Sequence, residues 1–137
     1  MEREEKELCA RALEMRKFSY VPYSRFRVGA ALLTAEGKIY TGCNIENAAY
    51  TPTMCAERTA FAKAVSEGER SFRAIAIAGG QEGAEPDYCA PCGVCRQVMR
   101  EFCDRDFRIL LVRSEGDCRE YTLEELLPHS FGPEDLA

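Results

Sequence analysis

Two segments with helical apolar spacing, each followed by a short apolar run, place the strongest constraint on how this chain can fold. Residues 55–67 are rich in alanine, and residues 93–103 repeat apolar side chains at the spacing of one helix face. The apolar runs that follow them, 74–78 and 109–112, are typical of buried strands. Consecutive strand–helix–strand units favour parallel strands joined by right-handed crossovers. The order of these segments therefore predicts an α/β layered sandwich.

The rest of the chain adds a hairpin and flanking helical segments to this frame. Residues 2–18 have amphipathic helical spacing, and the β-prone runs 28–34 and 39–45 lie on either side of a glycine-containing turn, as in a hairpin. A short strand near 120–122 precedes a turn of helix that begins with a capping-box pattern. Because 137 residues is the length of one domain, we expect a single domain over 1–137.

Charge and composition argue against several classes of protein. Acidic side chains outnumber basic ones, 23 to 18, whereas a protein that reads a phosphate backbone normally presents a basic face. No apolar run approaches the roughly 18 residues that span a membrane, and the first residues are too charged for a signal peptide. With 46% hydrophobic residues the composition is that of a globular protein. We therefore expect a cytoplasmic protein that binds neither a nucleic-acid polymer nor a membrane.

The cysteines are the most informative residues for function. Eight in one chain without a secretory signal indicate metal binding or reactive thiols more than disulfides. Cys55 begins the first crossover helix, while Cys92 and Cys95 begin the second, after Cys89 in a C-x2-C-x2-C pattern. Ligands of such sheets bind beyond the carboxyl ends of strands, where helices begin, so these thiols are expected at one edge. The other four cysteines are interpreted as small buried hydrophobes: Cys9, Cys43, Cys103 and Cys118.

Thiols at two helix N-termini suit a catalytic zinc ion. A helix N-terminus lowers the pKa of a thiol, and three protein ligands leave the fourth tetrahedral position open for water. Because three thiolates would leave the zinc site with net negative charge, we expect Arg58 to donate hydrogen bonds to a thiolate, with Arg96 as a second candidate. Glu57, two residues after Cys55, is placed to move a proton between the water and a substrate.

Spacing alone leaves a structural site open as an alternative. With Cys89 as a fourth ligand, the cysteines would form a closed four-cysteine zinc site without a catalytic role. An iron–sulfur cluster would need another cysteine three residues beyond Cys95, where the chain has Met99. Glu57 has no role in a purely structural site, which favours the catalytic interpretation.

The segments CAER at 55–58 and PCGVCRQ at 91–97 resemble the zinc signature of the cytidine deaminase family. The similarity covers nearly the whole chain. It implies a three-layer α-β-α sandwich with a mixed sheet of about five strands, and one zinc ion per subunit bound by Cys55, Cys92 and Cys95. The segments that carry the resemblance are CAER at 55–58, PCGVCRQ at 91–97, PYSRFRVGAAL at 22–32, NIENA at 44–48, and LLP at 126–128 with Phe131.

The resemblance implies hydrolysis of cytidine and deoxycytidine to uridine and deoxyuridine with release of ammonia, a step of pyrimidine salvage. Zinc hydroxide would attack C4 of the base while Glu57 protonates N3 and then carries a proton to the departing amino group. The resemblance further implies that Asn44 and Glu46 hydrogen-bond the ribose 3′-hydroxyl. Phe26 would pack on the base, and the Ala56 backbone with Glu57 would read its amide edge.

The chain has cysteine as the first ligand, in place of histidine, and in this it resembles the small homotetrameric branch of the family. In that branch each site takes residues from neighbouring subunits, which implies that Ala48, Tyr50 and Phe131 contribute across interfaces. Two alternatives stay open, namely a deaminase of larger cytosine nucleosides such as blasticidin S, and a structural zinc module. A deoxycytidylate deaminase is disfavoured, because that group usually has a histidine ligand and a basic phosphate pocket. Ala90 stands before Pro91 where the family usually has serine.

Overall fold

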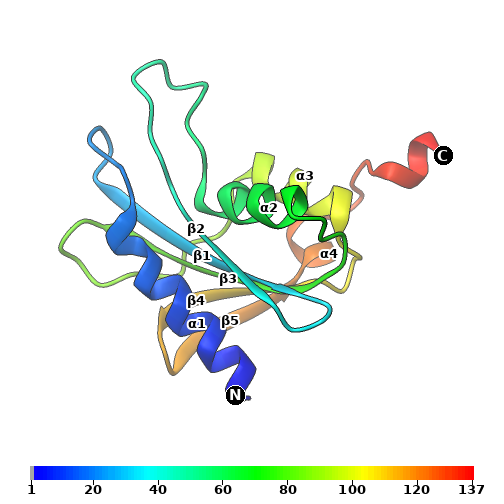
Figure 1. The fold of residues 1–137 in the computed structure, drawn as a ribbon, viewed down its shortest axis with the longest axis horizontal. Helices are drawn as coiled ribbons and strands as arrows, with labels where there is room; N and C mark the ends of the chain where they lie inside the picture. Colours follow the sequence, from blue (N-terminus) through cyan, green and yellow to red (C-terminus); the bar gives the residue numbers. More distant parts are fainter. Residues whose placement is uncertain (1) are drawn as a thin grey trace.

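A computed structural model describes residues 2–137 as one five-stranded sheet with helices on both faces (Figure 1). Among these residues, no helix combines the length and the hydropathy that crossing a bilayer requires. The helices are α1 (Arg3–Met15), α2 (Ala56–Ser66), α3 (Gly93–Phe102) and α4 (Leu123–Leu126), with short 3-10 turns at Arg16–Phe18 and Pro133–Leu136. The strands are β1 (Phe26–Thr34), β2 (Ile39–Cys43), β3 (Phe72–Gln81), β4 (Arg108–Ser114) and β5 (Asp117–Thr122).

The sheet is mixed and has the strand order β2-β1-β3-β4-β5. β1 is antiparallel to both β2 and β3, β3 and β4 are parallel, and β4 and β5 form an antiparallel hairpin. The predicted α/β fold with a mixed sheet is confirmed. The strands joined by α2 are not neighbours, although consecutive strand–helix–strand units suggest adjacent parallel strands. The connection passes over β1, so β2 and β3 run in the same direction without pairing.

The third strand is longer than the apolar run predicts. The apolar run covers 74–78, but β3 continues through Gly79 and Gly80 to Gln81 because both glycines pair with β1, where Arg27 lies opposite Gly80. A side chain at Gly79 would come within 3 Å of the side chain of Cys89, in the loop that leads to α3. The two glycines therefore allow that loop to approach β3 closely, and they do not form a turn.

Alternation along the strands separates two cores. Ile75 and Ile77 of β3 lie in the core beneath α2 and α3, whereas the small side chains Ala74, Ala76 and Ala78 face α1. Small side chains on that face let the helix pack close to the sheet, where its residues Leu8, Cys9 and Ala12 are fully buried. The result is the expected three-layer sandwich, with α1 on one face and α2 and α3 on the other (Figure 1).

Gly42 of β2 sets how closely the first turns of α2 approach the sheet. A Cβ atom at this position would overlap the carbonyl oxygen of Ala56 and come within 3 Å of the backbone nitrogen of Ala60. Gly42→Ala is expected to lower the free energy of unfolding by about 1–3 kcal/mol, measured by urea denaturation, because helix backbone cannot move aside cheaply. Gly116→Ala is the control, since a Cβ there meets nothing within 4 Å. Equal effects of the two substitutions would contradict this explanation.

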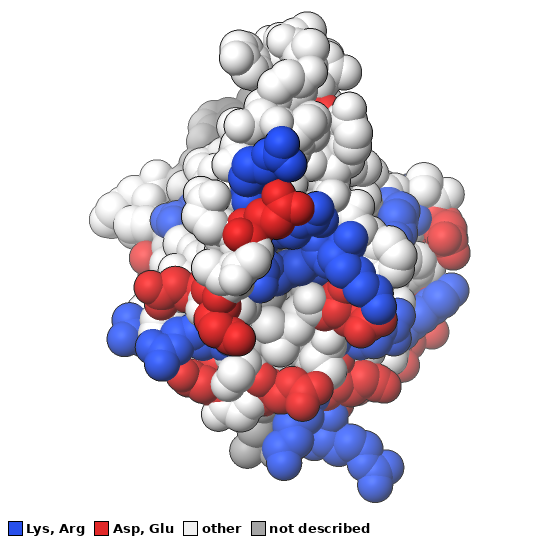
Figure 2. All heavy atoms as spheres, turned by 90° about the vertical axis from the view of Figure 1, so that its left-hand side faces the viewer, with Lys and Arg blue, Asp and Glu red and all other residues white. Residues whose placement is uncertain are grey.

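The surface at the left of Figure 1 carries charges of both signs, with Lys and Arg interspersed among Asp and Glu (Figure 2). Arg27 and Arg25 both pair with Glu82, at 2.9 and 3.5 Å. The projection at the top of this view is the connection between β2 and α2, whose residues 47–54 include no charged side chain. That projection precedes the first candidate metal ligand, Cys55.

Candidate metal centre and active site

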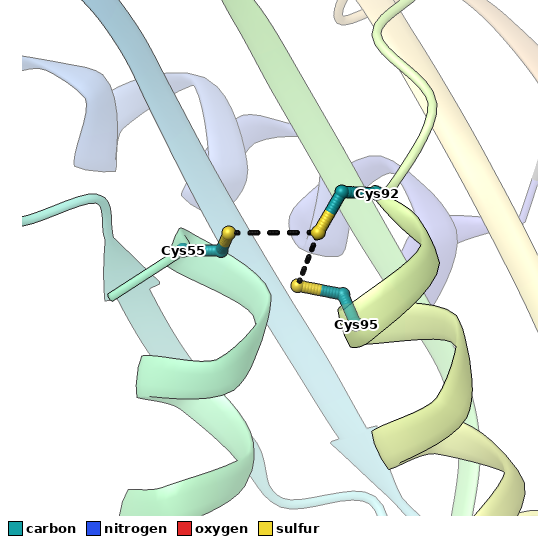
Figure 3. A group of neighbouring side chains, drawn as sticks. All are labelled: Cys55, Cys92 and Cys95. Atoms are coloured by element: carbon teal, nitrogen blue, oxygen red, sulfur yellow. Dashed lines mark hydrogen bonds between the residues drawn. The ribbon is translucent and has the colours of Figure 1, made fainter. Parts of the chain in front are cut away.

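Three cysteines from two helices meet at one edge of the sheet. Cys55 is the N-cap of α2, Cys92 is the N-cap of α3, and Cys95 lies in the first turn of α3. The Sγ atoms are 3.8 Å apart between Cys55 and Cys92 and 3.6 Å apart between Cys92 and Cys95. In Figure 3 the three side chains point toward one another from the starts of the two helices. The structure thus brings together the three residues that the sequence singled out.

The arrangement fits a tetrahedral zinc site. Zn–S bonds of about 2.3 Å in tetrahedral geometry place two sulfur ligands about 3.8 Å apart, close to the separations found here. All three Sγ atoms lie within 4.8 Å of one another, and the group contains no further Cys, His, Asp or Glu among residues 2–137. Three ligands leave one coordination position for water or substrate, which is the pattern of a catalytic rather than a closed structural site.

Cys89 lies outside the cluster. Its side chain packs against Gly79 of β3, and its Sγ is 4.0 Å from the carbonyl oxygen of Ala90. Burial raises the pKa of the Cys89 thiol to about 11, and its sulfur is not among the three that lie within 4.8 Å of one another. The fold therefore does not place Cys89 as a fourth ligand beside the other three cysteines.

Cys89→Ser is expected to leave zinc content at one ion per chain, measured by atomic spectrometry on purified protein. The reason is that the thiol packs against β3 and is not a ligand. Cys92→Ser in the same preparation should lose zinc, because it removes one of the three ligands. A fall in zinc content for Cys89→Ser comparable to that for Cys92→Ser would restore the closed site.

Arg58 supplies the expected positive charge. Its Nη2 donates to the Sγ of Cys55 and to the carbonyl oxygen of Thr53, both at 3.4 Å. Hydrogen bonding with Cys95, and then with Arg58, lowers the pKa of the Cys55 thiol to about 5 against the opposing effect of burial. A thiolate at neutral pH is the form that binds a metal. Arg96 does not share this task, since it donates to the carbonyl oxygens of Pro91, at 2.7 Å, and Leu126, at 2.6 Å.

Glu57 is the buried carboxylic acid of the site. It lies in the first turn of α2, directly after Cys55 and Ala56, and its residue is 4% exposed. Burial raises the pKa of Glu57 to about 7, and the nearby negative charge of Cys55 acts in the same direction. A carboxyl group with a pKa near the working pH can both accept and release a proton, which is what general acid–base catalysis requires.

Asn44 and Glu46 have backbone partners remote in the chain that the sequence did not reveal. The Oδ1 of Asn44 accepts from the Val28 amide at 2.9 Å, and its Nδ2 donates to the Phe26 carbonyl at 2.8 Å. The Oε1 of Glu46 accepts from the amides of Tyr23 and Ser24, at 3.0 and 3.1 Å. These bonds fix the start of β1, where Phe26 is the first residue, and within residues 2–137 one amide hydrogen and one lone pair of Asn44 stay available.

The remaining candidates divide into one buried residue and three exposed ones. Ala56, the first residue of α2, is fully buried. Ala48 and Tyr50 lie on the exposed connection before α2, and Tyr50 is 75% exposed. Phe131, in the segment after α4, is 60% exposed. Within residues 2–137, no hydrogen bond or aromatic contact joins Tyr50 or Phe131 to the cysteine cluster, although Tyr50 lines a pocket together with Ser24 and Glu46.

Two residues that hold the loop before Cys92 were missed by sequence reasoning. Arg16 donates from Nη2 to the Gly80 carbonyl at the end of β3, at 3.0 Å, and to the Ala84 carbonyl of the loop, at 3.4 Å. The hydroxyl of Tyr88 donates to Asp117 at 2.6 Å, which ties the loop to the β4–β5 hairpin. Both partners are remote in sequence, and the only local signal was the Gly79–Gly80 pair, which permits the close approach.

The family follows from comparison with known proteins. Residues 2–111 match the family described as the cytidine and deoxycytidylate deaminase zinc-binding region. The chain therefore belongs to the cytidine and deoxycytidylate deaminase family, and its three-cysteine cluster could hold the zinc ion of that family.

Within this family, the chain is similar to proteins named cytidine deaminase. A cytidine deaminase of Sporosarcina psychrophila is 52% identical over 130 residues, which cover 95% of this chain and 93% of that protein. A cytidine deaminase of Halalkalibacterium halodurans is 50% identical and covers 94% of this chain and 95% of its own. The crystal structure of cytidine deaminase from Burkholderia pseudomallei superposes with a TM-score of 0.83 at 43% identity, covering 96% of this chain and 100% of that one. The chain is thus similar to cytidine deaminases in both sequence and fold.

Proposed function

We propose that this protein catalyses hydrolytic deamination of cytidine and deoxycytidine to uridine and deoxyuridine. One water is consumed and one ammonia is released. The observation that carries this conclusion is the buried Glu57 directly beside a three-thiol cluster with an open coordination position. The names of the relatives by sequence and by structure agree with this reaction.

Glu57 is proposed as the proton carrier. A zinc ion bound by Cys55, Cys92 and Cys95 would supply Lewis-acid activation of a water molecule. Glu57 accepts a proton from the attacking water and delivers it to N3 of the base as C4 becomes tetrahedral. It then carries the second water proton to the amino group, so that ammonia leaves and the C4 carbonyl forms. Its burial keeps bulk water from competing for the proton.

Nucleoside binding is proposed for residues on the two segments that flank the cluster. Phe26 would pack on the base, and Asn44 and Glu46 would hydrogen-bond the ribose 3′-hydroxyl. The rigid start of β1 supports this assignment, because Asn44 is held at 2.8 Å from the Phe26 carbonyl and retains one donor. The Ala56 backbone with Glu57 would read the amide edge of the base.

A homotetramer is proposed as the working form, with Ala48, Tyr50 and Phe131 reaching the site of a neighbouring subunit. Exposed aromatic side chains support this, because aromatic residues are enriched at protein–protein interfaces relative to the rest of the surface. They include Phe18, Tyr20, Tyr23, Tyr50 and Phe131. We further propose that residues 1–137 act as one deaminase domain in the cytoplasm, where a reducing environment keeps thiolate ligands available. A solution mass near 15 kDa by light scattering would contradict the tetramer.

The test of the reaction is the ultraviolet absorbance of cytidine incubated with zinc-containing protein, with Glu57→Gln as control. Loss of the cytosine band with the wild type alone is the expected result. Equal turnover by both proteins would assign the proton transfer to another group. An unchanged spectrum with cytidine and deoxycytidine, in protein shown to contain zinc, would overturn the function and favour a modified nucleoside or a structural zinc site.

A further inference from the structure

Arg100 is a buried arginine of α3 that the proposed chemistry does not use. It is 7% exposed, and its guanidinium group is directed at the C-terminal segment rather than at the cysteines. Its Nε donates to the Oγ of Ser130 at 2.8 Å, its Nη1 donates to Glu134 at 3.2 Å, and its Nη2 forms an ion pair with the other oxygen of the same carboxylate. This two-point geometry is the strong and directional form of an arginine–carboxylate pair.

The segment 130–134 is shaped to receive this side chain. Gly132 is buried, and a Cβ atom there would overlap the guanidinium carbon and nitrogens of Arg100. The Gly132 amide donates to Asp135 at 2.8 Å, which closes the 3-10 turn that follows. The tail therefore packs closely around the Arg100 guanidinium group. Burial of this charge is tolerated because it is paired and hydrogen-bonded.

Phe131 lies between these anchoring contacts. Its carbonyl oxygen accepts from the Nε2 of Gln97 at 2.9 Å, one turn before Arg100 on α3. Its backbone is thus held on both sides by one helix, while the residue as a whole is 60% exposed. α3 also carries Cys95 and begins after Cys92, so the tail is attached to the same rigid element as two of the candidate zinc ligands (Figure 1).

We propose that Arg100 is a positioning residue for nucleoside binding, which holds the tail so that the Phe131 ring is presented in a fixed orientation to the site of a neighbouring subunit. This rests on the proposed function and on the proposed role of Phe131 in it. The guanidinium group does not touch the substrate. Its effect passes through the backbone of 130–134, so it acts on affinity for the nucleoside rather than on the chemical step.

The test is a double-mutant cycle on the zinc-containing protein with Arg100→Gln and Phe131→Ala. Each single substitution is expected to raise KM for cytidine by about three- to tenfold and to change kcat by less than about twofold, because an aromatic contact is lost while the metal site stays intact. The double variant should have the same KM as Phe131→Ala alone. Arg100→Lys should restore part of the loss, since it keeps the charge without the fork.

Control and companion variants separate this role from a general loss of stability. Arg105→Gln removes a comparable arginine from an exposed ion pair with Glu124, at 3.4 Å, and should leave KM unchanged. Gly132→Ala and Glu134→Gln disturb the same contact from the tail and should raise KM as Arg100→Gln does, which provides the measurement if Arg100→Gln does not fold.

Three results would overturn the proposal. Multiplicative effects of Arg100→Gln and Phe131→Ala on KM would show that they act independently. A fall in kcat with KM unchanged would place Arg100 in the chemical step. A KM unchanged in all the tail variants would show that the anchoring has no bearing on the substrate. Absence of turnover by the wild type would instead contradict the proposed function itself.

Discussion

Glu57→Gln is expected to lower kcat for cytidine by about 10²- to 10⁴-fold while zinc content stays at one ion per chain. Glutamine has nearly the same size and preserves the packing at the start of α2, but it cannot accept a proton from water. The measurement is the rate of loss of cytidine absorbance, with zinc determined on the same preparation. Burial raises the pKa of Glu57 to about 7, so the native carboxyl can move protons in both directions near neutral pH, and the amide cannot.

Glu67→Gln is the matched control for this substitution. Glu67 is the exposed C-cap residue at the other end of the same helix, so its replacement tests the loss of a carboxyl group without loss of the proton carrier. It should leave kcat within about twofold of the wild type, as expected for an exposed side chain. Glu57→Gln protein that retained zinc and full turnover would contradict the proposed role, and simultaneous loss of zinc would assign Glu57 to the metal site.

Cys55→Ser is expected to remove both zinc and activity. The two remaining thiols, Cys92 and Cys95, belong to one turn of α3 and cannot enclose the ion from the α2 side. Serine oxygen is a poor replacement, because a thiolate is the stronger zinc ligand. The pKa of Cys55 is lowered to about 5, which favours its thiolate form at neutral pH. We expect zinc well below one ion per chain, turnover at the background rate, and a lower midpoint of thermal unfolding, since a bound metal stabilises the folded state.

Cys43→Ser provides the comparison for the loss of a thiol elsewhere. Cys43 is half-buried at the end of β2 and is not part of the cluster, so its replacement should keep zinc and turnover. Retention of a full zinc complement by Cys55→Ser would show that the metal is bound without the α2 ligand. That result would contradict the three-cysteine site, whereas loss of zinc by both variants would point to a general effect of serine on stability.

Local patterns account for the elements and for the identity of the metal ligands. The capping box at Thr122 is confirmed, with its Oγ1 accepting from the Glu125 amide at 3.2 Å and its own amide donating to Glu125 at 2.8 Å. Cys55 and Cys92 are N-caps, as the apolar spacing after each of them indicated. Such features depend on neighbours within a few residues, so the order of residues is sufficient to predict them.

The tertiary structure decided which remote groups meet. The place of β1 between β2 and β3, and the packing of Cys89 against Gly79 instead of at the metal, depend on how strands pair across the sheet. Arg96 reaches the carbonyl of Leu126, 30 residues away, and Arg100 reaches Glu134, 34 residues away. A sequence predicts helices, strands and ligand types because these follow from local spacing. It does not specify the partners of a long polar side chain, because those depend on which backbone groups the folded chain leaves within reach.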